Sequence, residues 1–182
     1  MSRFLRAIAT PAAFLLLATV LHAAPPPRPA SPQKKDYLSD AEADKIRDAG
    51  TTGPRIVLFM KFAQDRIKKI QYELAHIDPA ERHRADRLNS LLNGYIGCVD
   101  DATDLLDLGV EKQEDIREGI KTMQARLKEF LPYLQQLSAN GPERETYKDN
   151  LDDAIEGTQD AIKEVEMDMK EMSPPPVRRK QS

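Results

Sequence analysis

The sequence predicts an all-α protein, an antiparallel up-down-up-down four-helix bundle with a short extra N-terminal helix and disordered, proline-rich tails. Three observations lead to this prediction. Four long stretches repeat apolar residues at alternating spacings of three and four, short turn signals separate the stretches, and basic proline-rich segments flank them. Those spacings average about 3.5 residues, which is typical of helices that pack along a common seam.

Each stretch keeps its register for six or seven steps. The predicted seam positions, in chain order, are Ile56, Met60, Ala63, Ile67, Ile70, Leu74 and Ile77; Ala85, Leu88, Leu92, Tyr95, Val99, Ala102 and Leu106; Ile116, Ile120, Met123, Leu127, Phe130, Leu134 and Leu137; and Tyr147, Leu151, Ile155, Thr158, Ile162, Val165, Met169 and Met172. The second stretch carries a further stripe at Leu91, Cys98 and Leu105, and such a wide apolar face suits a bundle core.

The segments between the stretches carry helix-boundary signals. Gly53-Pro54, Asp78-Pro79 and Gly141-Pro142 suit helix starts, and Gly109 suits a helix end. All the connections are short, so neighbouring helices are expected to run antiparallel.

Other local signals mark a short helix and two possible interruptions. Ser39-Asp40-Ala41-Glu42 is a capping box that opens a short helix, which Gly50 closes. Asn93-Gly94 and Pro132 interrupt the second and third long stretches, and a proline inside a helix costs about 3 kcal/mol. The apolar repeat keeps its register across both interruptions, and Gly94, Gly97 and Pro132 fall on outward positions. We therefore predict continuous helices, with a kink near Pro132.

The N-terminus has the pattern of a secretory signal peptide. Arg3 and Arg6 precede an apolar run over 7–21, and His22-Ala23-Ala24 then leads into prolines. A membrane-spanning helix needs about 20 apolar residues, and this run is shorter. We expect cleavage after Ala23, a periplasmic or extracellular location, and no stable membrane insertion of the mature chain.

The remaining sequence divides by composition. Residues 24–37 form a basic proline-rich linker, 38–172 the helical bundle domain, and 173–182 a basic proline-rich tail. Residues 36–99 hold 10 basic and 10 acidic side chains, whereas 100–172 hold 9 basic and 20 acidic ones. This acidic body, together with the export signal, argues against nucleic acid as a partner.

Cys98 is the single cysteine of the chain, so no internal disulfide can form. The sequence leaves two alternatives open for it. Cys98 is either buried in the core or forms an intermolecular bond in a homodimer.

Two patterns raise the possibility of a metal. Met167, Met169 and Met172 supply soft thioethers of the kind that bind Cu(I), but Met169 and Met172 fall on the seam and Met167 on the opposite face. Core packing is therefore the favoured interpretation, and a periplasmic copper or small-ligand binding bundle is the alternative. Glu73-x-x-His76 has the spacing of a di-iron motif, but His76 faces outward and no second such motif exists.

Leu58 and Phe62 fall on outward positions one turn apart, in a segment that is apolar on nearly every side. Either the short helix over 39–49 folds back to cover them, or a partner docks there. These two residues are the preferred interaction site.

No catalytic constellation and no cofactor motif is found. A nucleophile needs a base within hydrogen-bond reach, and the mature chain has only His76 and His83, while Cys98 lies among apolar neighbours. The sequence therefore predicts a non-enzymatic exported bundle that acts through protein–protein interaction with an unidentified partner.

Overall fold

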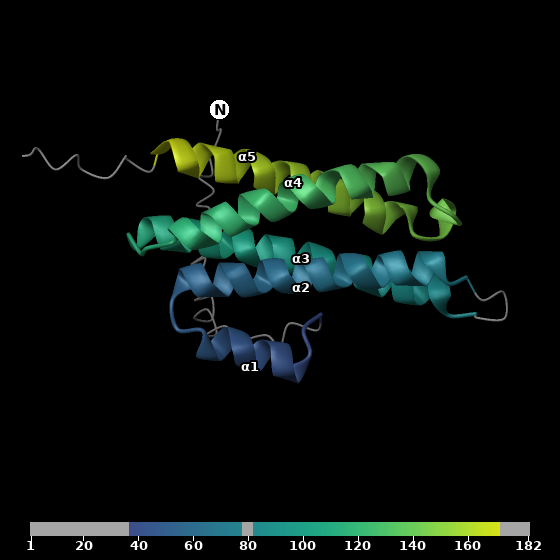
Figure 1. Cartoon of the computed structure of the whole chain (residues 1–182), viewed down its shortest axis with the longest axis horizontal. Coiled ribbons are helices and arrows are strands. Elements are labelled where there is room, and N and C mark those ends of the chain that lie inside the picture. The colour runs from purple at the N-terminus through teal and green to yellow at the C-terminus, as the bar shows by residue number, and fades with distance from the viewer. Residues whose placement is uncertain (1–36, 78–81, 172–182) are drawn as a thin grey trace, which may run out of the picture. The chain divides into compact units, whose positions relative to one another are not determined.

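The computed structural model describes residues 37–77 and 82–171, and the regular structure within these ranges is entirely helical (Figure 1). The helices are α1 (Asp40–Asp48), α2 (Thr52–Ala75), α3 (Arg84–Glu111), α4 (Arg117–Asn140), the short 3-10 helix η1 (Arg144–Thr146) and α5 (Lys148–Glu171). The all-α prediction is confirmed. The predicted signal peptide over 1–23, the linker up to residue 36 and the tail over 173–182 lie outside the described residues, as does Met172.

α1 begins and ends where the sequence predicts. The Glu42 backbone amide donates to the Ser39 hydroxyl at 3.3 Å, and the Ser39 amide donates to the Glu42 carboxylate at 2.9 Å. This is the predicted capping box. After the helix, Gly50 takes a φ of 71°, a left-handed conformation that glycine adopts without steric cost.

Each of the four long helices packs against two others. α2 packs against α3 and α4, and α5 packs against the same two helices, whereas α3 and α4 make little contact. Figure 1 shows α2 beside α3 and α4 beside α5. This packing is consistent with a bundle. The short connection over 112–116 therefore joins α3 to α4, the two consecutive long helices with the least mutual contact.

The predicted seam forms the core along α2, α3 and α4. All seven predicted positions of the third stretch are buried, six of them in α4 and Ile116 directly before it, and so are six of the seven in α3. The exceptions in α2 are Leu74, which is half-buried, and Ile77, which is exposed because α2 ends at Ala75.

In α5 the predicted register is partly wrong. The buried stripe runs through Ala154, Thr158, Ala161 and Val165, whereas Met169, predicted on the seam, is 40% exposed. At two positions the buried residue is an alanine, Ala154 or Ala161, and the larger isoleucine that follows it is only half-buried. The prediction had followed the larger residues and therefore placed these two positions one residue too late.

Thr158 is accommodated in the core because its hydroxyl makes two hydrogen bonds. It donates to the Ala154 carbonyl at 2.6 Å and accepts from the Tyr95 hydroxyl at 2.6 Å. Tyr95 in turn meets the Phe130 ring edge to face at 5.7 Å, which is a favourable aromatic geometry.

The helix-breaking signals do not break the helices. α3 continues through Asn93-Gly94, and α4 continues through Pro132, which is exposed. The outward assignment of the glycines is wrong, however, since Gly94 is buried and Gly97 is half-buried. The kink near Pro132 stays a prediction.

Cys98 is fully buried. Of the two alternatives for this thiol, the structure favours the core position, and an intermolecular disulfide would require the helices around it to open.

Across 37–77 and 82–171, no helix combines the length and the apolar character that crossing a membrane demands.

Candidate functional site

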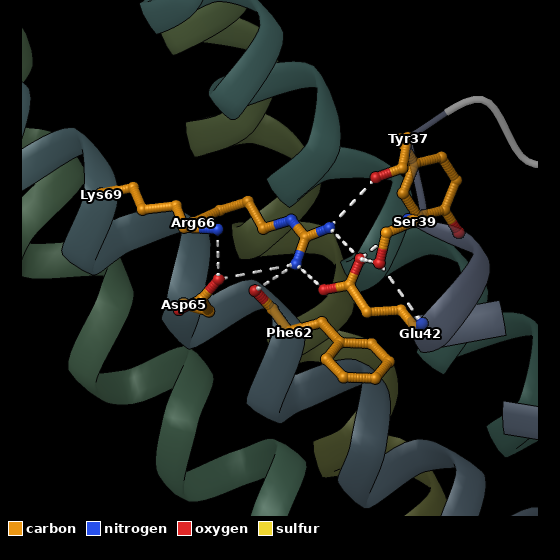
Figure 2. A network of polar contacts seen from close by, with 7 residues as sticks. All are labelled: Tyr37, Ser39, Glu42, Phe62, Asp65, Arg66 and Lys69. Atoms are coloured by element: carbon orange, nitrogen blue, oxygen red, sulfur yellow. Dashed lines mark hydrogen bonds and ion pairs between the residues drawn. The ribbon is translucent and has the colours of Figure 1, made fainter. Parts of the chain in front are cut away.

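Arg66 on α2 is the centre of a polar network that fastens α1 to the bundle (Figure 2). Its side chain is only 8% exposed, and a buried guanidinium needs a counter-ion and hydrogen-bond acceptors. Glu42 of α1 supplies both carboxylate oxygens, with Nη2 donating to Oε2 at 2.8 Å and Nη1 donating to Oε1. The guanidinium also donates to the Tyr37 carbonyl at 3.1 Å and to the Phe62 carbonyl at 3.4 Å.

The pair is ionised at neutral pH. The pKa of Glu42 is lowered to about 2, mainly by the hydrogen bonds from Arg66. The Ser39 amide, the Ser39 hydroxyl and the Arg66 charge act in the same direction, and together these effects outweigh the opposing effect of burial. The same hydrogen bonds raise the pKa of Arg66 above its usual value.

Two glycines of α3 make room for this network. A Cβ atom at Gly97 would lie 2.6 Å from Cε1 of Tyr37, and one at Gly94 would lie 3.5 Å from Cγ and Nε of Arg66. The Tyr37 ring therefore lies directly against the α3 backbone at Gly97. We call the surface of Arg66, Gly94 and Gly97 the α1 seat. Two small residues three apart on one helix face were the sequence signal for this close approach.

α1 packs on α2, the helix that carries the apolar patch singled out by the sequence. Phe62 is 5% exposed, and Leu58 is half-buried against the core. Leu38 and Ile46 join the same apolar cluster. The fold-back alternative agrees with this arrangement, and partner docking at Leu58 and Phe62 stays a prediction.

Beyond Tyr37 a groove runs along α2 and α3. It consists of two cavities of about 500 and 540 Å³ that share Lys69, Ser90 and Leu91. Volumes of this order are typical of ligand sites. The first cavity, which we call the open groove, is lined by Lys68, Lys69, Tyr72, Glu73, Arg87, Ser90 and Leu91.

The open groove combines apolar surface with positive charge. Leu91 is half-buried, and Tyr72 is 62% exposed, its ring stacked on His76 with the centroids 4.1 Å apart. Lysine stems add further apolar surface. The lining holds three cations and one anion, in the part of the chain where the sequence is not acidic.

Two of the groove cations are held in place by carboxylates. Arg87 donates to both oxygens of Glu73, at 3.3 Å from Nε and 2.8 Å from Nη2, and Lys69 lies 2.8 Å from the Asp65 carboxylate. Lys68 is exposed and, among the described residues, makes no ion pair. A bound anion would meet Lys68 without having to compete with a carboxylate of the described chain.

An acidic surface lies elsewhere, where α3 packs on α5. The pKa of Glu164 is raised to about 7, mainly by burial and then by the hydrogen bond with Asp107 and the charges of Asp107, Asp168 and Asp104. Asp101, which lies near Asp104 and Asp107 in the sequence of α3, is buried, with 8% of its surface exposed.

Of the three methionines predicted as a metal site, Met167 and Met169 lie in the described part of the chain. Met167 is 55% and Met169 40% exposed, so the seam position expected for Met169 is wrong, and Met172 lies outside the described part. Within 37–77 and 82–171, no three His, Cys, Asp or Glu side chains are placed to hold a metal ion. Glu73 and His76 are engaged separately, by Arg87 and Tyr72. Copper binding by the methionines stays a prediction.

The geometry thus defines an all-helical protein with a cationic, partly apolar groove beside a helix held by an ion pair. Comparison of the chain with protein-family models, with curated proteins and with solved structures finds no match.

Proposed function

We propose that this chain is an exported, non-enzymatic helical-bundle protein that acts through protein–protein interaction in the cell envelope or outside the cell. The observation that carries the proposal is the open groove of α2 and α3, in which Tyr72 and Leu91 lie among Lys68, Lys69 and Arg87. The signal-peptide pattern at 1–23 supports export. The contacts between the long helices and the short connections that join them support an antiparallel up-down-up-down arrangement.

α1, which packs beside the open groove on α2, indicates what kind of segment the surface of α2 and α3 accepts. α1 carries Asp40, Glu42 and Asp44 in its first turns, presents Ile46 to the apolar cluster, and pairs Glu42 with Arg66. The open groove offers the same combination of apolar surface and cations. We therefore propose that the partner presents an acidic amphipathic helix, which would lie in the groove as helical ligands do in other binding proteins.

A binding measurement on the mature protein tests this proposal. The probe is a fluorescent helical peptide with leucines on one face and glutamates on the other, compared with a peptide in which lysines replace the glutamates. We expect only the acidic peptide to bind. An exposed ion pair contributes about 0.5 to 1 kcal/mol, so Lys68→Glu with Lys69→Glu should weaken binding about tenfold.

The matched control is Lys121→Glu with Lys170→Glu, two exposed lysines on α4 and α5. Equal loss in both double variants would mean that only net charge matters, and the groove assignment would then be withdrawn. Sequencing the N-terminus of the protein from its native compartment tests export. We expect Ala24 as the first residue, and a chain that retains Met1 would contradict export.

The alternative function is a periplasmic copper or small-ligand carrier. The exposure of Met167 and Met169 favours it, because exposed thioethers are accessible to Cu(I). Titration of the mature protein with Cu(I) tests it. An unchanged stoichiometry in the Met167→Leu, Met169→Leu and Met172→Leu triple variant would dismiss a methionine site.

A further inference from the structure

α1 depends on the α1 seat for its stability. It has nine residues, and none of them is buried. Isolated helices shorter than about 12 residues are marginal in water. The contacts that hold the segment are the Glu42–Arg66 pair, the Tyr37 ring on Gly97, and the apolar contacts of Leu38 and Ile46.

The seat is equally dependent on α1. Without Glu42, the Arg66 guanidinium would lose its main counter-ion while its side chain remained against Gly94 of α3. A buried charge without a counter-ion is strongly destabilising. The seat is therefore expected to stay occupied by a segment with the chemistry of α1.

The hinge between α1 and α2 is short, and its glycine is exposed. Only Ala49, Gly50 and Thr51 separate the two helices, and a Cβ atom at Gly50 would meet nothing within 4 Å. The chain reversal thus rests on the left-handed φ of Gly50. If Gly50 became helical, α1 and α2 could continue as one helix, and α1 would point away from its own seat.

The start of α2 does not depend on the hinge. The Thr52 amide and hydroxyl both donate to the Glu114 carboxylate, which comes from the connection between α3 and α4. The bundle can therefore keep its structure while α1 moves, because the anchor of the α2 N-terminus lies on the bundle side.

We propose that two copies of this chain exchange α1 reciprocally, so that the Tyr37 to Asp48 segment of each copy occupies the α1 seat of the other in a homodimer. Every contact of the seat is then repeated between the copies, which is the property that makes such exchange inexpensive. The charge complementarity of Glu42 and Arg66 selects α1 as the occupant. This inference does not rest on the open groove, and its failure would leave the proposed partner binding intact.

A charge-exchange experiment tests the proposal directly. One full-length mature chain carries Glu42→Arg and a second carries Arg66→Glu, so each alone places two like charges at its seat. In a mixture, reciprocal exchange brings opposite charges together in both seats at once. We expect native mass spectrometry to show a one-to-one heterodimer at least tenfold more abundant than either homodimer. A mixture containing only the two monomers, both helical by circular dichroism, would overturn the proposal.

A hinge variant tests it without changing the seat. Gly50→Ala disfavours the left-handed φ and should raise the dimer association constant at least tenfold in sedimentation equilibrium. Gly157→Ala is the matched control, because Gly157 lies within α5 with open space at its Cβ position, and it should leave association unchanged. A Gly50→Ala chain that associates no more strongly than the control up to millimolar concentration would also overturn the proposal.

Discussion

At the scale of single residues, the Glu42–Arg66 pair is the interaction that positions α1. The two side chains are 15% and 8% exposed, and the guanidinium binds both oxygens of the carboxylate. Because water is largely excluded, losing one partner costs more than it would at an exposed ion pair.

Glu42→Gln is predicted to release α1 while keeping its capping box, since glutamine at this position still accepts from the Ser39 amide. Breaking a largely buried pair costs about 3 kcal/mol, so amide exchange in α1 should quicken roughly 100-fold at pH 6, whereas the middle of α3 should be unaffected. Hydrogen exchange followed by mass spectrometry measures this. Equal acceleration in α1 and α3 would show that the pair supports the bundle as a whole.

The same pair predicts a pH dependence in acid. The pKa of Glu42 is lowered from 4.5 to about 2 in the folded protein, so its stabilising contribution is full above pH 4.5 and is lost as the pH falls toward 2. Protection of the α1 amides should decline over this interval in the natural chain. The Glu42→Gln chain should lack that decline, and a parallel decline in both chains would contradict this assignment.

Glu164 is predicted to have the opposite pH dependence. Its pKa is raised from 4.5 to about 7, so the contribution of its protonated form is full below pH 4.5 and is lost as the pH rises through 7. Glu164→Gln should therefore raise the free energy of unfolding at pH 8, by about 0.5 to 1 kcal/mol given the partial exposure of the side chain.

Urea unfolding at pH 5 and pH 8 measures the effect of Glu164→Gln. The matched control is Glu156→Gln, an exposed position on the same helix. An equal gain in both variants would attribute the effect to net charge alone and not to the neighbours Asp104, Asp107 and Asp168.

At the scale of helices, the glycines of α3 decide how closely α1 can approach. Gly97→Ala would place a Cβ atom 2.6 Å from the Tyr37 ring, so the ring must move and the entry to α1 should loosen. We expect about tenfold faster exchange of the α1 amides. Gly157→Ala, with nothing near its Cβ position, should instead stabilise α5 by up to about 1 kcal/mol. Unchanged α1 exchange in Gly97→Ala would mean that Tyr37 contributes little to holding α1.

The helices themselves could be predicted from the periodicity of apolar residues, because a helix that buries one face repeats its apolar residues with the helical period. Every predicted seam position that lies in α4 is buried. In α5 the pattern of large residues was misleading, since Ala154 and Ala161 form the centre of the buried face. Small residues carry little hydrophobic signal even where they permit the closest packing.

The candidate site was harder to predict, for a different physical reason. Arg66 and Glu42 lie 24 positions apart, and nothing in the local pattern distinguishes this arginine from the solvated cations beside it. The apolar patch at Leu58 and Phe62 indicated that something covers α2, but the identity of the cover depends on tertiary contacts. Likewise, the open groove combines residues of two helices, and single-helix periodicity does not reveal such a surface.

At the scale of the whole described chain, two surfaces differ in the sign of their charge. The open groove on α2 and α3 is cationic and partly apolar, whereas the contact of α3 with α5 gathers carboxylates. An acidic partner would be attracted to the first surface and repelled by the second, so this separation favours a single orientation of binding.

The most direct test of the proposed function is NMR chemical-shift mapping of the isotope-labelled mature protein during titration with the acidic amphipathic peptide. We expect saturable shifts centred on Lys68, Tyr72, Arg87 and Leu91, with the signals of α5 unchanged. Shifts confined to other surfaces, or none at all, would contradict the assignment of the α2 and α3 groove as the binding site.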